Sequence, residues 1–394
     1  MPIFEPFIGL RYSPSHVRSL DDVVCPPYDV ISEAERQAFE AKSPYNVVRL
    51  ELPPESDGPG RYERAALLLD SWRDGGILRR DPAPAFYGYR MSFRDPAGRP
   101  RQTLGVIGAL GVEEPGGGVL PHEETTPKAK TDRLELLSAT QANLSPIWGL
   151  SPAGGLSAAL VAPPHPACRA LDEQGVAHEL WPITAAQPIA DIRSLVESEP
   201  VLIADGHHRY ETALHYHRSS AAPGSEAVMA LVVELSEEQL TVQAIHRLLV
   251  GLPRGFDLVG GLAEWFDLTP AGPVDRGLLA EMEEAGALAV LTEGQAWLAR
   301  PRAKLAEAAP HDLDSSRLDV ALASLPAHQV VYQHGWDDAA AAVAAGLADA
   351  AVLVRPASVA QIAAVARGGV RMPPKTTFFW PKPRTGMVIR ELLG

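Results

Sequence analysis

The stretch at residues 201–218 constrains the fold of this chain more than any other. Residues 201–204 form a short apolar run after a proline, which is typical of a buried strand. Helix-forming residues begin at Tyr210, and only polar or small residues stand between the two segments. These are Asp205, Gly206, His207, His208 and Arg209. The pattern predicts a buried strand that turns almost directly into a helix.

Such a turn has the chemistry of a phosphate-binding site. A glycine lets backbone amides approach a ligand, and the N-terminus of a helix attracts an anion. The side chains of His207, His208 and Arg209 add donors that suit phosphate oxygens. The alternative is an ordinary turn in which Asp205 caps the helix and the histidines face solvent. Five polar or small residues between a buried strand and a helix favour a functional site.

A zinc site at the same turn is disfavoured by helix geometry. His208, His215 and His217 lie close together in sequence. Each residue turns a helix by about 100°, so His215 and His217 point about 200° apart and cannot both face His208.

Composition sets broader limits on the class of protein. A chain of 394 residues is too long for one typical core, so we expect two or three subdomains. A formal net charge of −14 argues against direct nucleic-acid or membrane binding. Cys25 and Cys168 form no CxxC motif, and neither a signal peptide nor an apolar run of membrane-spanning length is evident. We therefore expect a cytoplasmic protein.

Segments typical of strands and segments typical of helices follow one another along the chain. A turn signal between residues 85–93 and 103–112 predicts a hairpin, and residues 227–233 a central strand. Residues 47–52 are also expected to form a strand.

Three further segments carry chemical groups. Tyr28 and Asp29 follow two prolines and are either ligand groups or parts of a structural corner. Residues 121–133 alternate acids and bases, which by itself favours a solvated loop. In the tail, Lys375, Lys382 and Arg384 are candidates for reaching a phosphate.

Five motifs together resemble the bacterial and archaeal domain-of-unknown-function 1015 family over nearly the whole chain. The motifs are PPYDVI, LPHEETTPKAKTDR, ANLSPIWGL, ADGHHRYETA and RMPPKTTFFWPK. The central region in turn resembles free-serine kinases of the ParB/sulfiredoxin-like fold, through P-H-E-E at residues 121–124 and D-G-H-H-R at residues 205–209.

The resemblance implies an α+β fold with an embedded core. The ParB/sulfiredoxin-like, phosphate-binding core would span residues 116–250. Family-specific α/β regions at residues 1–115 and 251–394 would flank it, and the C-terminal region would return to the site.

The resemblance also implies roles for individual residues. Glu123 would act as base on a serine hydroxyl, with Glu124 as the alternative, and Asp205 would orient the hydroxyl or bind Mg²⁺. His207 and His208 would be catalytic, and with Gly206 and Arg209 they would stabilise the transferring phosphoryl group. Further phosphate or nucleotide contacts are expected from Lys128, Lys130, Arg133, Lys375 and Lys382. Further substrate contacts are expected from His122, Glu124, Tyr28, Asp29 and Asn143.

The expected function is phosphoryl transfer from a nucleotide, ATP or ADP with Mg²⁺, to free L-serine. Two alternatives stay open: a phosphomonoester phosphatase, in which water replaces the acceptor, and a non-catalytic nucleotide-binding regulator. Zinc, NAD and haem are not expected. The expected partners are the small-molecule substrate and the nucleotide, and the sequence is also compatible with a homodimer.

Overall fold

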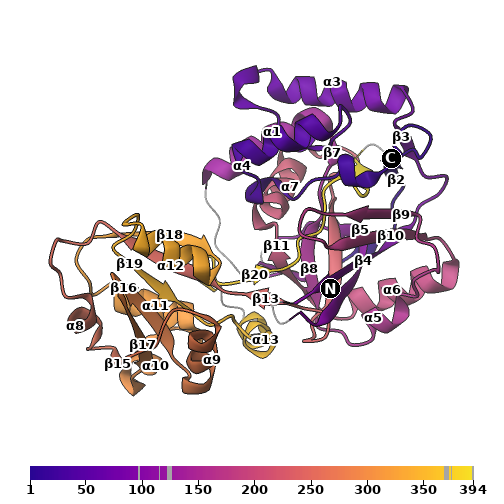
Figure 1. Cartoon of the computed structure of the whole chain (residues 1–394). Coiled ribbons are helices and arrows are strands. Elements are labelled where there is room, and N and C mark those ends of the chain that lie inside the picture. Colours follow the sequence, from indigo (N-terminus) through magenta and orange to yellow (C-terminus); the bar gives the residue numbers. More distant parts are fainter. Residues whose placement is uncertain (96–97, 115, 122–126, 368–371, 374, 393–394) are drawn as a thin grey trace. The chain divides into compact units, whose positions relative to one another are not determined.

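The computed structural model describes residues 1–95, 98–114, 116–121, 127–367, 372–373 and 375–392. The chain forms two compact units, one of residues 1–241 with 381–394 and the other of residues 242–380 (Figure 1). Both units mix helices and strands, as the sequence predicts for the fold class. None of the helices described is both long and apolar enough to cross a membrane. The functional division at residues 115/116 and 250/251 stays a prediction.

The first unit is built on a large twisted sheet. Nine strands of the described residues form it: eight in the order β6-β11-β8-β12-β5-β4-β10-β9, with β1 beside β5. Their bounds are β1 Phe4–Glu5, β4 Phe86–Arg94, β5 Pro100–Gly111, β6 Val119–Pro121, β8 Ile147–Ser151, β9 Cys168–Leu171, β10 Ala177–Ile183, β11 Val201–Asp205 and β12 Ala227–Glu234. The apolar strand β12 lies between β8 and β5, where both of its faces are covered, and its residues from Val228 to Val233 are buried.

Helices and a second sheet complete this unit. The helices are α1 Glu33–Lys42, α2 Val48–Glu51, α3 Arg61–Asp74, α4 Pro127–Thr140, α5 Leu156–Ala159, α6 Ala186–Glu197 and α7 His207–Ser220, with 3-10 turns η1 Leu20–Asp22, η2 Tyr28–Val30 and η3 Glu55–Asp57. The second sheet has the order β3-β2-β21-β7, from β2 Gly9–Tyr12, β3 Leu78–Arg80, β7 Ala142–Asn143 and β21 Ile389–Glu391. Because β21 pairs with β2 and β7, the C-terminal tail is part of the first unit.

Local sequence patterns predicted several of these elements. The hairpin of β4 and β5, the central strand β12 and the buried strand β11 are confirmed. Helix α7 begins at His207, three residues before the expected start. The strand expected at residues 47–52 is wrong, because this apolar run forms α2. The side chain of Asn46 accepts a hydrogen bond from Val48 N at 3.0 Å, which favours a helical turn over an extended strand.

The second unit has its own sheet and core. Six strands among the residues described pair in the order β15-β17-β16-β19-β14-β18. They are β14 Ile245–Val250, β15 Phe266–Pro270, β16 Leu288–Thr292, β17 Gln295–Pro301, β18 Gln329–His334 and β19 Ala350–Leu353, and the short pair β13 Val242–Gln243 and β20 Phe378–Phe379 stands apart. The helices are α8 Leu258–Leu262, α9 Arg276–Ala285, α10 Ala303–Ala308, α11 Asp314–Leu322, α12 Trp336–Ala344 and α13 Val359–Arg367.

The buried His246 in this unit gives a testable pH dependence. Its Nδ1 accepts a hydrogen bond from Val354 N at 3.3 Å, and burial lowers the pKa of His246 to about 4. The unfolded chain, with an ordinary histidine pKa near 6.5, therefore binds the proton first as pH falls. The contribution of His246 to the unfolding free energy is therefore fully present above about pH 6.5. It decreases by about 3 kcal/mol as the pH falls to about 4.

Replacing His246 with asparagine keeps an acceptor near Val354 and removes the titration. Denaturant unfolding at several pH values should show that His246→Asn lacks this part of the acid-side loss. The exposed His165→Asn serves as the matched control and should follow the wild type. Equal pH profiles for wild type and His246→Asn would show that His246 does not cause this loss of stability.

Candidate functional site

The turn singled out in the sequence joins strand β11 to helix α7. The strand is buried up to Ala204 and ends at Asp205. Gly206 has a left-handed backbone with φ of +87°, which lets α7 begin at the next residue. Gly206 stands at the N-cap position and has no side chain that could cap the helix. The N-terminus of α7 is therefore suited to receive an anion.

Two cations meet on the carboxylate of Asp205. Lys382 Nζ lies 2.5 Å from Oδ1, and Arg209 Nη2 lies 3.0 Å from Oδ2. Although burial raises the pKa of Asp205, the nearby charges of Lys382 and Arg209 prevail and lower it to about 2. Asp205 is therefore ionised at neutral pH and holds both cations at the start of α7.

Arg209 links this turn to a second buried carboxylate. Its Nη1 donates to Pro146 O at 2.5 Å and to Ser145 Oγ at 3.1 Å. The Ser145 hydroxyl donates in turn to Glu51 Oε1 at 2.9 Å. Glu51 is only 2% exposed, and burial raises its pKa although Arg133 and Arg209 oppose the shift. The Glu51 carboxylate therefore lies in a buried environment beside two arginine charges.

Arg133 closes the cluster from helix α4. It donates to the backbone carbonyl of Glu51 at 2.8 Å and pairs with Asp132 at 2.5 Å. Its guanidinium lies 4.1 Å from the centre of the Tyr28 ring, a cation–π contact. Burial raises the pKa of Tyr28 to about 12, so the phenol stays protonated.

A small cavity opens between these groups. Its volume is about 50 Å³, and its polar lining is Glu51, Arg133, Asn143, Ser145, Arg209 and Thr212. Among the residues described, neither the Thr212 hydroxyl nor Arg209 Nε has a hydrogen-bond partner. Both groups are buried, so a polar occupant of this cavity would satisfy them.

The structure brings together several residues that the sequence predicts for the site. Tyr28, Arg133, Asp205, Arg209 and Lys382 belong to one cluster, and Asp29 is close enough to act on the pKa of Glu51 and Arg209. His207 is buried and its charged form lowers the pKa of Asp205, while His208 is half-buried. Their roles in binding and catalysis stay predictions.

Asn143 lies at the cavity but has structural partners. Its Oδ1 accepts hydrogen bonds from Met229 N at 2.9 Å and from Arg390 Nη1 at 3.1 Å. Substrate contact by Asn143 stays a prediction.

Other predicted site residues are not placed at the cluster. His122, Glu123 and Glu124 lie outside the described residues, as do the side chains of Lys128 and Lys130. Lys375 belongs to the second unit, so its part in the site also stays a prediction.

Two residues of the cluster, Glu51 and Ser145, escape the sequence analysis. Glu51 stands within a largely apolar run. A charged residue in such a run is the sequence signal that could have indicated a buried carboxylate here.

The described residues do not offer a ready site for Mg²⁺. Both oxygens of Asp205 already accept hydrogen bonds from cations. Within the described ranges, no group of three or more His, Cys, Asp or Glu side chains is arranged to hold a metal ion. No chemical step through Mg²⁺ is therefore derived from these residues.

Replacing Gly206 with alanine should disturb the cluster through a single methyl group. An added Cβ would lie 3.0 Å from Arg209 Nη2 and 3.0 Å from Ile147 Cγ2, in a backbone region that favours glycine. We expect a loss of about 1–3 kcal/mol in unfolding free energy.

The matched control for this substitution is Gly155→Ala. Gly155 also precedes a helix with positive φ, but an added Cβ there meets no atom within 4 Å. The control should show the backbone strain alone, so a loss equal to that of Gly206→Ala would show that Arg209 is not displaced.

Comparisons with known proteins identify a family for this chain but no activity. A family model described as "Protein of unknown function (DUF1015)" matches residues 4–321. No curated protein sequence matches the chain.

Several solved structures are similar at low identity. A conserved hypothetical protein from Pyrococcus furiosus is 14% identical, with a TM-score of 0.39, over 70% of this chain and 93% of that one. A free serine kinase in complex with AMP is 15% identical, with a TM-score of 0.37, over 66% of this chain and 83% of the kinase. SbnI from Staphylococcus aureus, truncated at its C-terminus, is 12% identical, with a TM-score of 0.39, over 71% and 85%. These likenesses are too distant to carry an argument about the substrate.

Proposed function

The chain belongs to the DUF1015 family, and we propose that it is a small-molecule phosphotransferase acting at the β11–α7 turn. The observation that carries the proposal is the meeting of Lys382 and Arg209 on Asp205 at a helix start whose N-cap residue is a glycine. Backbone amides, a guanidinium and an amine are the donors that stabilise a transferring phosphoryl group. Here they are held in a buried environment, where such interactions are stronger than in water.

The acceptor is a small hydroxyl compound, and free L-serine is our first candidate. The buried carboxylate of Glu51 beside Arg133 and Arg209 complements the ammonium and carboxylate groups of an amino acid. The cavity of about 50 Å³ has room for a small polar group and not for a nucleobase. The nucleotide, ATP or ADP, would reach the turn from outside this cavity.

In the proposed reaction, the acceptor oxygen attacks the terminal phosphorus of the nucleotide. The bond from phosphorus to the bridging oxygen breaks, and ADP or AMP leaves. The hydroxyl proton passes to Glu123, the proposed base. Strand β6 runs parallel to β11, with Pro121 opposite Ile203, so the segment that leads to the P-H-E-E motif belongs to the same sheet as the β11–α7 turn.

A crystal grown in phosphate tests the anion site directly. The anion is expected at residues 206–209, against the start of α7 and the amine of Lys382. The same turn without an anion, in a crystal that binds phosphate elsewhere, would contradict the proposal.

A further inference from the structure

Two residues after Lys382, Arg384 anchors the tail segment through a closed ring of hydrogen bonds. The ring is formed by Arg384, Tyr89, His178 and Asp172. The backbone N of Arg384 donates to the hydroxyl of Tyr89 at 3.0 Å, and this hydroxyl lies 2.8 Å from His178 Nδ1. His178 Nε2 lies 3.1 Å from Asp172 Oδ2, which is also 2.7 Å from Arg384 Nη2. The ring thus begins at the backbone of Arg384 and ends at its side chain.

The protonation states of this ring are mutually consistent. Although burial raises it, the hydrogen bond from His178 and the charge of Arg384 lower the pKa of Asp172 well below its usual range. Asp172 therefore only accepts, and His178 Nε2 donates to it. Burial lowers the pKa of His178, so its imidazole is neutral. Its Nδ1 then accepts a hydrogen bond from the Tyr89 hydroxyl.

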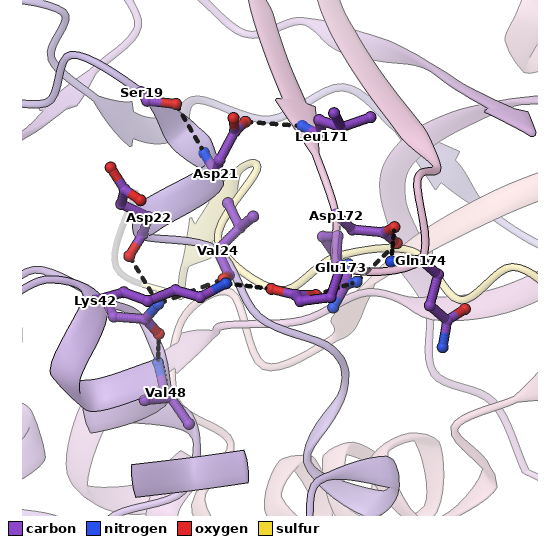
Figure 2. A network of polar contacts seen from close by, with 12 residues as sticks. Ser19, Asp21, Asp22, Val24, Lys42, Val48, Leu171, Asp172, Glu173 and Gln174 are labelled. Carbon is purple, nitrogen blue, oxygen red and sulfur yellow. Dashed lines mark hydrogen bonds and ion pairs between the residues drawn. The ribbon is translucent and has the colours of Figure 1, made fainter. Parts of the chain in front are cut away.

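The loop that supplies Asp172 is itself fixed. Asp172 accepts hydrogen bonds from Gln174 N at 2.9 Å and Val176 N at 2.8 Å, which closes the turn between β9 and β10. Figure 2 shows Glu173 reaching from this turn to Lys42 of α1. Glu173 also pairs with Arg384 at 2.8 Å. Next to Arg384, the buried Thr385 forms two backbone hydrogen bonds with Cys25, at 2.9 and 3.3 Å.

Lys382 is joined to this anchor by a stiff connection. The only residue between Lys382 and Arg384 is Pro383, and Pro381 precedes the lysine. Both prolines are buried, and their rings fix φ, so little backbone freedom separates the anchor from the lysine. The amine of Lys382 then spans to Asp205, which lies 177 positions away in sequence.

We propose that Arg384 is a positioning residue, which holds the amine of Lys382 against Asp205 through the ring formed with Tyr89, His178 and Asp172. The consequence for phosphate binding rests on the proposed function. The placement of the amine does not, and it can be measured without a ligand.

The test uses the full-length protein and limited acetylation with acetic anhydride, read by mass spectrometry. Tyr89→Phe removes only the hydroxyl that joins the two halves of the ring, and Arg384→Gln removes the ion pairs. Both should raise the acetylation rate of Lys382 about tenfold relative to Lys304, because a charge-assisted hydrogen bond protects the amine to about that extent. An unchanged Lys382 rate in Tyr89→Phe would overturn the proposal, whether or not Arg384→Gln folds.

Tyr87→Phe is the matched control on the same strand. Its hydroxyl is also buried and hydrogen-bonded, to Gly9 N at 2.7 Å and to Asp81 at 2.8 Å. This variant should lose a comparable amount of stability and leave the Lys382 rate unchanged. An equal rise in both tyrosine variants would mean general loosening and would overturn the positioning role.

A binding measurement then separates the two proposals, with ADP as the probe. Tyr89→Phe should weaken ADP binding in the wild-type background and have no further effect in Lys382→Met, because the two act as one unit. If Tyr89→Phe weakens ADP binding equally in the wild-type and Lys382→Met backgrounds, Tyr89 does not act through Lys382 and the proposal is overturned. If the wild type binds no ADP while Tyr89→Phe still exposes Lys382, the phosphotransferase proposal fails and the positioning role stands.

Discussion

Replacement of Arg209 with glutamine is expected to lower the unfolding free energy by about 3–5 kcal/mol and turnover by about 10²–10³-fold. The guanidinium is buried and paired with Asp205, and it also bonds Ser145 and the carbonyl of Pro146. Removing one partner of a buried ion pair leaves an uncompensated charge, which accounts for the stability loss. In the proposed reaction, Arg209 is one of the donors to the developing phosphoryl charge, so its removal is expected to lower turnover.

Arg218→Gln is the control on the same helix. Arg218 pairs with Glu114 where both side chains are at least half exposed, and such surface pairs contribute about 0–1 kcal/mol. Denaturant unfolding should therefore separate the two variants clearly. Equal stability losses would show that the buried pairing of Arg209 contributes nothing beyond a surface pair.

Replacement of Glu123 with glutamine is expected to lower turnover by about 10²–10⁴-fold, with nucleotide affinity nearly unchanged. Glutamine keeps the shape of the side chain but cannot take the hydroxyl proton, and general-base assistance is typically of this size. Steady-state kinetics and calorimetric titration with nucleotide measure the two quantities separately.

Glu135→Gln, at an exposed position of helix α4, is the control and should retain the turnover. Full turnover in Glu123→Gln would mean that Glu124 or Asp205 is the base. A collapse of nucleotide affinity would instead make the carboxylate a structural or metal ligand.

The sequence predicts the β11–α7 turn because the signals for it are local. A buried strand, a glycine and a helix occupy adjacent positions, so the pattern at residues 201–218 is enough to predict the elements that meet there. The expected approach of Lys382 to the turn came from its place in a basic tail motif, and the structure has Lys382 and Asp205 2.5 Å apart.

The carboxylate of Glu51 could not be predicted, for two physical reasons. Residues 47–52 are apolar enough to suggest a strand, whereas the chain forms a short helix that the contact of Asn46 with Val48 favours. The partners of the Glu51 carboxylate, Ser145 and Arg133, come from segments that are distant in sequence. The ring that holds Arg384 is equally non-local, since Tyr89, Asp172 and His178 show no motif that marks them as a group.

The most direct test of the central claim is product formation by the full-length protein. The protein is incubated with Mg²⁺, either ATP or ADP, and a panel of amino acids that includes L-serine, and the mixture is read by mass spectrometry. We expect O-phosphoserine together with an equal amount of ADP from ATP, or of AMP from ADP. Release of inorganic phosphate without a phosphorylated amino acid would indicate hydrolysis instead, and nucleotides and amino acids that all remain unchanged would contradict phosphoryl transfer.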